Sequence, residues 1–270
     1  MTAQKLMEAM AAEDVSIGKI ANIVEYDQAV CANVLHIANS SLYAGLSELD
    51  SIESALARLG TTAITNMIFT EQLSAICADA PLYDLLENDL WFHGALSSLA
   101  AGEIRARCRA HEIPAMASLA ALMHDIGKLI IVRYVRLDSS AITELCETKG
   151  IPFVAAEEEL IGCHHAEVGA AMARKWKFPE SITRAIGEHH QVPIKEPTLI
   201  GDTVQLANLV AKNLGVGLGA EGMNFRFDLG LPDRLGLDYA DFLMVCNRTY
   251  ERMDAIREAY GIVGESVRTT

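Results

Sequence analysis

One adjacent pair of residues, His124 and Asp125, constrains the structure of this chain more than any other feature. The pair lies in the middle of SLAALMHDIGKLIIV, which is apolar on almost every face of the helix that its spacing predicts. A helix that is apolar all round is normally buried. A buried aspartate is rare unless a partner or a metal ion compensates its charge. We therefore expect a partner for Asp125, and a divalent cation would satisfy the imidazole and the carboxylate together.

The composition and the periodicity favour an all-α fold. Of 270 residues, 51% are hydrophobic and only 6% are aromatic, a balance typical of helices packed on helices. Apolar residues recur at three- and four-residue spacing through the first 80 residues, and a helix is expected to end at Gly60. Prolines then stand where later helices would begin. We expect these helices over 82–110, 114–137, 139–149, 153–176, 180–190, 198–214 and 239–260, with a long glycine-rich loop over 215–236.

The net charge limits the class of partner. A formal charge of −14 argues against a nucleic-acid polymer, because phosphate backbones are bound by clustered lysines and arginines. A small phosphorylated molecule is compatible with this charge if a cation reverses the local field. No apolar run approaches the roughly 20 residues that a membrane span needs, and the first residues lack the apolar core of a secretory signal. We therefore expect a cytoplasmic protein without a membrane partner.

Histidines are concentrated where helices are predicted. One buried histidine is more often a hydrogen-bonded core residue than a ligand, and the His124–Asp125 pair alone is equally compatible with a hydrogen-bonded core pair. Further histidines at helical positions that can converge on this pair favour a metal site. The six histidines in or beside these predicted helices are His93, His124, His164, His165, His189 and His190.

The order His, His-Asp, His, His-His resembles the HD superfamily of metal-dependent phosphohydrolases, whose most characteristic string is HDIGK, here at 124–128. Three earlier pieces, VLHIANSSLY (34–43), SIESALARLG (51–60) and LWFHG (90–94), resemble the bacterial HDOD family, the HD-related output domains. The segment HAEVGAAMARKWKFPESITRAIGEHH (165–190) continues that resemblance. It implies an HD-domain-like multi-helix bundle with an N-terminal helical subdomain. The expected parts are 1–80 (N-terminal helices), 81–214 (metal-binding core) and 215–270 (a loop and a C-terminal helix packing on the core).

The resemblance also implies a set of site residues. The site would hold one or two divalent ions, with iron and manganese as the expected metals, and Asp125 would bridge two of them. Lys128 matches a lysine that faces the substrate phosphate in related phosphodiesterases, so Asp125 and Lys128 are the expected catalytic residues. The implied metal ligands are His93, His124, Asp125, His165, His189, His190 and Asn208, with Asp202 as the alternative to Asn208.

Two departures from the superfamily leave the function open. Asn208, a neutral and weaker ligand, stands where the superfamily has its last aspartate, and Asp202 lies on a different helical face. No GYP string follows His189–His190, so the substrate-reading loop of cyclic di-GMP phosphodiesterases is missing.

The first hypothesis is a metal-dependent phosphohydrolase acting on a phosphoester, such as a nucleotide, in bacterial signalling. The alternative is a non-catalytic HDOD module that docks a signalling protein and whose metal is structural or senses redox state. A third hypothesis is the oxygenase-like chemistry of some di-iron HD-fold proteins.

Overall fold

The computed structural model describes residues 5–6, 9, 16–25, 27–43, 49–74, 80–86, 88–109, 112–222, 224 and 226–259. In these ranges the chain is helical and has no β-strand, only an isolated bridge between Ala80 and Leu85. The all-α prediction is confirmed. Among the same residues, no helix combines the length and the apolar character that crossing a bilayer requires.

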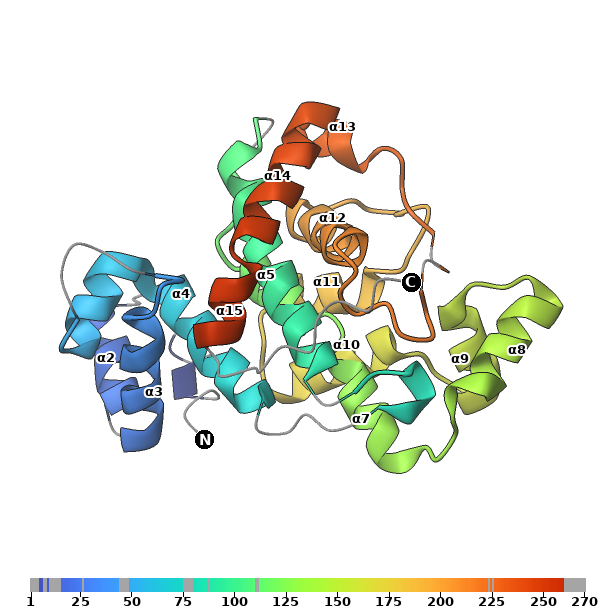
Figure 1. The fold of residues 1–270 in the computed structure, drawn as a ribbon, viewed down its shortest axis with the longest axis horizontal. Helices are drawn as coiled ribbons and strands as arrows, with labels where there is room; N and C mark the ends of the chain where they lie inside the picture. Colours follow the sequence, from blue (N-terminus) through green and yellow to red (C-terminus); the bar gives the residue numbers. More distant parts are fainter. Residues whose placement is uncertain are drawn as a thin grey trace.

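The N-terminal helices lie at one end of the molecule (Figure 1). Helices α2 (Ile17–Glu25) and α3 (Gln28–Ala38) pack on each other and on α4 (Ile52–Ser74). Gly60, with φ 81° and ψ 165°, breaks α4 into two parts. The predicted helix end at Gly60 is therefore confirmed, because only the missing Cβ makes this backbone conformation inexpensive.

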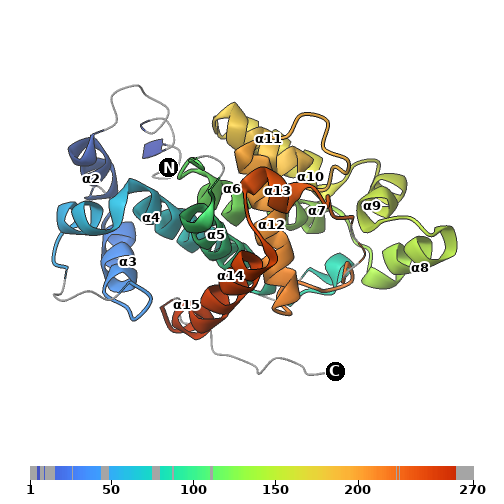
Figure 2. The same ribbon diagram turned by 90° about the horizontal axis from the view of Figure 1, so that it is seen from above.

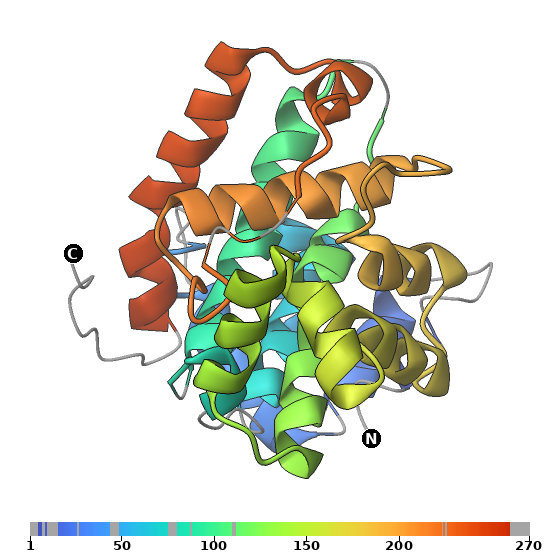
Figure 3. The same ribbon diagram turned by 90° about the vertical axis from the view of Figure 1, so that its right-hand side faces the viewer.

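The middle of the molecule is built around α5 (Asp89–Arg107), which packs most extensively on α6 (Ala117–Met123) and α12 (Leu199–Asn213). Because α5 is apolar on most faces, it is buried between its neighbours. Beside this layer, α10 (His165–Lys175) packs on both α7 (Ile126–Tyr134) and α11 (Glu180–Glu188). Figure 3 shows α12 crossing above these helices.

Shorter elements cover the periphery. Helices α8 (Ser139–Lys149) and α9 (Phe153–Ile161) lie at the end opposite the N-terminal helices (Figures 1 and 2). The 3₁₀ turn η1 (Pro81–Tyr83) packs against α7 and α8. After the short helix α13 (Leu231–Leu235), α14 (Tyr239–Glu251) and α15 (Met253–Ala259) run along α5.

Several predicted helices are shorter than expected, each because of a local break. The helix expected over 82–110 begins only at Asp89, after η1. The one expected over 153–176 is two helices, since Gly162 adopts φ 84° and His164 then caps α10. The last one divides at Arg252, and the expected loop over 215–236 contains α13. The helix expected over 139–149 is confirmed by α8.

Candidate metal centre

The chain turns at His124 and Asp125 instead of continuing as a helix. Helix α6 ends at Met123 and α7 begins at Ile126, so the continuous helix predicted over 114–137 is wrong. Consecutive side chains on an α-helix point about 100° apart, which would send the two side chains in different directions. With the turn, His124 and Asp125 reach the same buried point.

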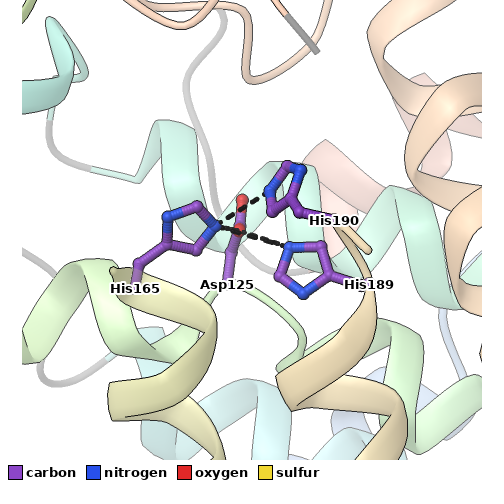
Figure 4. Close-up of side chains that lie close together, drawn as sticks. All are labelled: Asp125, His165, His189 and His190. Carbon is purple, nitrogen blue, oxygen red and sulfur yellow. Dashed lines mark hydrogen bonds and ion pairs between the residues drawn. The ribbon is translucent and has the colours of Figure 1, made fainter. Parts of the chain in front are cut away.

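Five histidines converge on Asp125, three of which Figure 4 shows together with it. Their ligand atoms form two groups, and within each group all these atoms lie within 4.8 Å of one another. The first group is Asp125, His165, His189 and His190, and the second is His93, His124 and Asp125. All are buried except the half-buried His190. The structure therefore brings together six of the seven residues predicted as metal ligands.

Four of the five imidazoles already use their Nδ1 atom in a hydrogen bond. Carbonyl and carboxylate oxygens only accept hydrogen bonds, so each Nδ1 carries a proton and donates it. In the neutral ring, Nε2 is then left with a lone pair directed at the cluster, which is how partners outside the ligand set orient metal-binding histidines. The Nδ1 contacts are His93 to Val216 O (3.0 Å), His124 to Ala121 O (2.7 Å), His165 to Glu157 Oε2 (2.6 Å) and His189 to Ile186 O (2.7 Å).

The contact between His93 and His124 has the spacing of two ligands of one metal ion. Their Nε2 atoms lie 3.2 Å apart. Burial lowers the pKa of His93 to about 4 and the pKa of His124 well below its usual value, so both rings are neutral. Both protons are on Nδ1, so no hydrogen bond joins the two Nε2 atoms and two lone pairs face each other. Two nitrogens held at about 2.1 Å from one metal ion lie about 3.0 Å apart at right angles and about 3.4 Å apart at tetrahedral angles, which matches this spacing.

His165 is held differently from the other imidazoles. Burial alone would lower the pKa of His165, but the Glu157 carboxylate, assisted by Asp125, raises it to about 9. Its Nε2 lies 3.0 Å from His190 Nε2 and 3.4 Å from His189 Nε2. Without a metal, a proton on His165 satisfies this crowded point. A metal ion would take the place of that proton, as is usual when histidines become ligands.

Asp125 faces both groups of histidines. Its Oδ1 lies 3.2 Å from His165 Nε2 and 3.5 Å from His189 Nε2, whereas its Oδ2 lies 3.5 Å from His124 Nε2 and 3.7 Å from His93 Nε2. Burial would raise the pKa of Asp125, but Lys128 and the histidines hold it well below its usual value. The charged carboxylate is therefore arranged as a bridge between two adjacent ligand groups.

Lys128 lies inside the centre and not at an open surface. Its ammonium group is buried and donates to Asp125 Oδ2 at 2.8 Å and to Glu221 Oε2 at 2.9 Å. Burial would lower the pKa of Lys128, but the two carboxylates raise it, so the group is charged. The resemblance implies that Lys128 faces a substrate phosphate. In this structure its ammonium group contacts the carboxylates of Asp125 and Glu221.

The two candidates for the last ligand position differ in their surroundings. Asp202 accepts two hydrogen bonds from Arg234, at 2.8 and 2.9 Å, and belongs to neither group of ligand atoms. Asn208 is buried on α12, the helix that packs on α5. Its Oδ1 has no hydrogen-bond partner among the described residues. Of the two, only Asn208 offers a free buried oxygen.

Replacing Asp202 with asparagine should therefore destabilise the protein without removing metal. The neutral amide can accept only one of the two hydrogen bonds from the Arg234 guanidinium, whose remaining charged partner is Asp228 at 3.1 Å. Leaving a buried group without its partner costs about 1–3 kcal/mol. Urea unfolding should show this loss, while metal analysis of the folded variant should match the wild type. A fall in metal content would make Asp202 a ligand.

Two buried residues that sequence reasoning missed support His165. The Glu157 side chain is fully buried, accepts from His165 Nδ1, and accepts at 2.6 Å from the Tyr83 hydroxyl. Glu157 lies in a run of three glutamates, EEE at 157–159, of which the next two are exposed. The sequence carries no signal that separates the buried glutamate from its exposed neighbours.

Replacing Glu157 with glutamine should weaken metal binding about 10–100-fold, the usual effect of changing a residue that orients a ligand. The amide oxygen can still accept from His165, but its charge no longer supports the imidazole. Competition with a fluorescent chelator measures the affinity. The matched control is Glu158→Gln, the same change at the exposed neighbouring position. Equal affinities in the two variants would contradict the role of Glu157.

Comparisons with known proteins identify the family and the fold. The family model described as HDOD domain matches residues 1–192. The crystal structure of an HDOD domain protein from Geobacter sulfurreducens is 24% identical, with a TM-score of 0.71, and covers 97% of this chain and 91% of that one. A Marinobacter aquaeolei VT8 protein provisionally named for signal transduction is 23% identical, with a TM-score of 0.78, over 96% of this chain and 58% of that one.

A third solved structure, from Shewanella amazonensis SB2B and provisionally named a phosphohydrolase, is 18% identical with a TM-score of 0.69, over 96% of this chain and 93% of that one. Identities this low establish a shared fold alone. Among curated proteins, an uncharacterized protein of Treponema pallidum (strain Nichols) is 22% identical over 212 residues, which are 78% of this chain and 41% of that protein. The chain therefore spans less than half the length of this relative.

Proposed function

This chain belongs to the HDOD family, and on that premise we propose that it is a metal-binding signalling protein whose centre holds a divalent transition metal between Asp125 and the surrounding histidines. The observation that supports this proposal most strongly is the pair His93 and His124, whose lone pairs face each other at 3.2 Å. A cation between the two nitrogens would accept both lone pairs and remove their repulsion. The name of the Marinobacter aquaeolei structure is consistent with the signalling role.

The donor set fits iron or manganese. It combines imidazole nitrogens with carboxylate oxygen, a mixture that these ions accept. Asp125 Oδ1 is buried and lies 3.2 Å from His165 Nε2, whereas Asn208 Oδ1, also buried, has no hydrogen-bond partner among the described residues. Unsatisfied buried oxygens of this kind are costly unless an ion uses them. The larger group, Asp125 with His165, His189 and His190, is the main site, and the smaller group is a second site of weaker affinity.

The ligand residues are buried, His190 only partly, and the cavity beside them is small, which favours a signalling role over the hydrolysis of a substrate. The cavity next to His190 and Glu221 has a volume of about 20 Å³. A site of roughly 10–15 Å³ admits one water molecule, so this cavity has room for a water molecule and is too small for a phosphoester. The cavity is lined by Pro152, Val154, His190, Glu221, Asn224 and Arg226.

Phosphoester hydrolysis is the second candidate function, favoured by the sharing of Asp125 between two ligand groups. Divalent ions in such a centre supply Lewis-acid stabilisation and a water that ionises near neutral pH. Of the chain's own residues, Asp125 would hold the two positions in register, and Lys128 would bind a phosphoryl oxygen. The name of the Shewanella amazonensis structure is consistent with this activity.

The test is a metal analysis followed by an activity screen. The protein is purified from cells grown with iron or with manganese, and bound metal is measured per folded chain. We expect about one ion per chain, and a protein that binds none under either condition contradicts the proposal. Each metal-loaded preparation is then incubated with generic phosphomonoesters and phosphodiesters. If the wild type hydrolyses one of these esters and the Asp125→Asn variant does not, phosphoester hydrolysis becomes the favoured function.

A further inference from the structure

We propose that the cleft between α4, α5 and α15 is a binding site for a free α-amino acid with an apolar side chain. The carboxylate of this ligand would pair with Arg252, its ammonium group with Glu103, and its side chain with the aliphatic residues of the cleft. The proposal goes beyond the proposed function and does not depend on it, because the residues that line the cleft include none of the metal ligands. It identifies a small molecule to which a signalling protein can respond.

The cleft lies where the N-terminal helices meet the helices of the middle layer. It has a volume of about 340 Å³, and small-molecule sites usually have volumes of about 300–1,000 Å³. Residues of α4, α5, α6 and α15 line it, together with Leu42, Tyr43 and Arg252. Arg252 joins two of these segments, because its Nη2 donates to Leu42 O at 3.1 Å, and α15 runs beside α5 (Figure 1). A ligand in the cleft therefore contacts parts of the chain that are far apart in the sequence.

Arg252 and Glu103 form a pair of opposite charges that no hydrogen bond joins. Arg252 Nη1 lies 3.8 Å from Glu103 Oε1, whereas a charge-assisted hydrogen bond is about 2.7–2.9 Å long. Glu103 Oε2 accepts from Arg107 at 2.6 Å, and among the described residues no donor bonds to Oε1. The side chains of Arg252 and Glu103 are 36% and 18% exposed, so solvent screens their charges only in part. The cleft thus presents one cation and one anion whose hydrogen-bonding capacity is not used up.

The two charged groups of an α-amino acid match this pair. Both are attached to one carbon atom, so the nitrogen and the carboxylate carbon lie about 2.5 Å apart. One molecule can therefore accept from Arg252 through its carboxylate and donate to Glu103 Oε1 through its ammonium group. A guanidinium group has five N–H donors in a fork that matches a carboxylate, and Arg252 uses one of them for Leu42 O. A ligand with only one of the two charges would leave one member of the pair without a partner.

Two further polar groups of the cleft favour a ligand that has a carboxylate. Arg105 lines the cleft, its Nε donates to Ile113 O at 2.9 Å, and no carboxylate among the described residues forms an ion pair with it. Ser98 Oγ accepts from Asn66 Nδ2 at 3.1 Å, so the hydroxyl hydrogen of Ser98 remains available as a donor. Both groups are donors, and an alkylammonium ion without a carboxylate has no atom that can accept from them.

The apolar part of the lining accounts for the side chain of the ligand. Small residues of the lining, Ala63 and Ala95, leave space that a ligand side chain would use. An apolar ligand side chain that leaves water for this surface gains affinity through the hydrophobic effect. Glycine, which has no side chain, should therefore bind more weakly than leucine. The aliphatic surface comes from four larger side chains, those of Leu42, Leu59, Leu99 and Ile256.

The test is isothermal titration calorimetry of the purified chain with ligands that share one carbon skeleton. L-Leucine should bind, and it is compared with isocaproate, which lacks the ammonium group, and with isoamylamine, which lacks the carboxylate. Each of these two should bind at least about tenfold more weakly than leucine, because each leaves one of the two charged residues without a partner. Glycine should also bind at least about tenfold more weakly, because it buries no apolar side chain.

A variant of the cleft locates the binding. Glu103→Gln keeps the size of the side chain but removes the charge that the ammonium group needs. It should lower the affinity for leucine to that for isocaproate without weakening isocaproate, a difference that a general distortion of the cleft would not produce. The matched control, Glu158→Gln, changes an exposed glutamate of α9 outside the cleft and should bind leucine as the wild type does. If Glu103→Gln fails to fold, Ala63→Leu serves instead, because a larger side chain at this half-buried position should block leucine.

Three results would overturn the inference. The first is a wild type that does not bind leucine, and the second is a Glu103→Gln variant that binds leucine as the wild type does. The third is isocaproate that binds as tightly as leucine, which would make the cleft a site for carboxylates in general. Metal content is measured on the same preparations. A chain that binds leucine but no metal contradicts the proposed function and leaves this inference intact.

Discussion

Replacing Asp125 with asparagine is expected to eliminate metal binding. Asp125 supplies the only carboxylate in either ligand group, and its oxygens lie within 3.7 Å of the Nε2 atoms of the four buried imidazoles. The amide has no charge to compensate a divalent ion. The loss should exceed the roughly 10–100-fold that changes outside the ligands cause. Metal analysis of the purified variant measures the effect, with less than a tenth of the wild-type content as the expected result.

The same substitution should lower the free energy of unfolding by about 3 kcal/mol, the low end of the cost of breaking a buried ion pair. Lys128 loses its Asp125 partner but keeps Glu221, which limits the loss. The control is Asp202→Asn, which also breaks a buried ion pair but lies outside both ligand groups. The two variants should both be less stable, and only Asp125→Asn should lack metal. An Asp125→Asn protein that retains its metal would refute the metal centre as described.

The helical class of the fold followed from residue spacing, but several of the helix ends did not. The three- and four-residue periodicity that predicts a helix over 114–137 continues through the turn at His124 and Asp125, because the residues on both sides are buried. Periodicity indicates which residues face the core. It does not reveal a short break in a helix when the residues on both sides of the break are buried. Gly162 interrupts the helix expected over 153–176 in the same way, although as a glycine it offered a visible signal.

The histidines of the centre were predictable, whereas its charged partners were not. A histidine in an apolar helix is unusual enough to be noticed. The HDIGK string then identifies the superfamily, whose pattern implies which other histidines are ligands. Glu157 and Glu221 are ordinary acidic residues in the sequence and become part of the centre only through tertiary contacts. Glu221 lies in a segment expected to be a loop, where a charged residue normally faces solvent. Lys212, whose Nζ lies 2.6 Å from Glu221 Oε1, is in the last turn of α12, where a lysine is favourable because it interacts with the helix dipole.

One glycine sets the distance between the two helices that carry the centre. Gly127 of α7 lies against the start of α10, where a Cβ would be 1.8 Å from the His165 carbonyl oxygen and 2.8 Å from Gly169 N. Both neighbouring atoms belong to the backbone, so no side chain can rotate away to make room. Gly169 in turn has Gly127 N at 3.4 Å from the place of its own Cβ. The glycine of HDIGK thus permits the close contact that brings His165 to Asp125.

Replacing Gly127 with alanine is therefore expected to cost more than about 3 kcal/mol of stability, the upper range for an overpacked core. Helices α7 and α10 would have to separate, and His165 would move away from Asp125, so the metal content should fall together with the midpoint of urea unfolding. The control is Gly102→Ala in α5, where the nearest atom to the new Cβ is Ser118 Oγ at 4.0 Å. There the same substitution should stabilise the protein by about 0.5–1 kcal/mol, because alanine is the better helix former. Equal unfolding midpoints for the two variants would show that α7 and α10 are not in the close contact on which the centre depends.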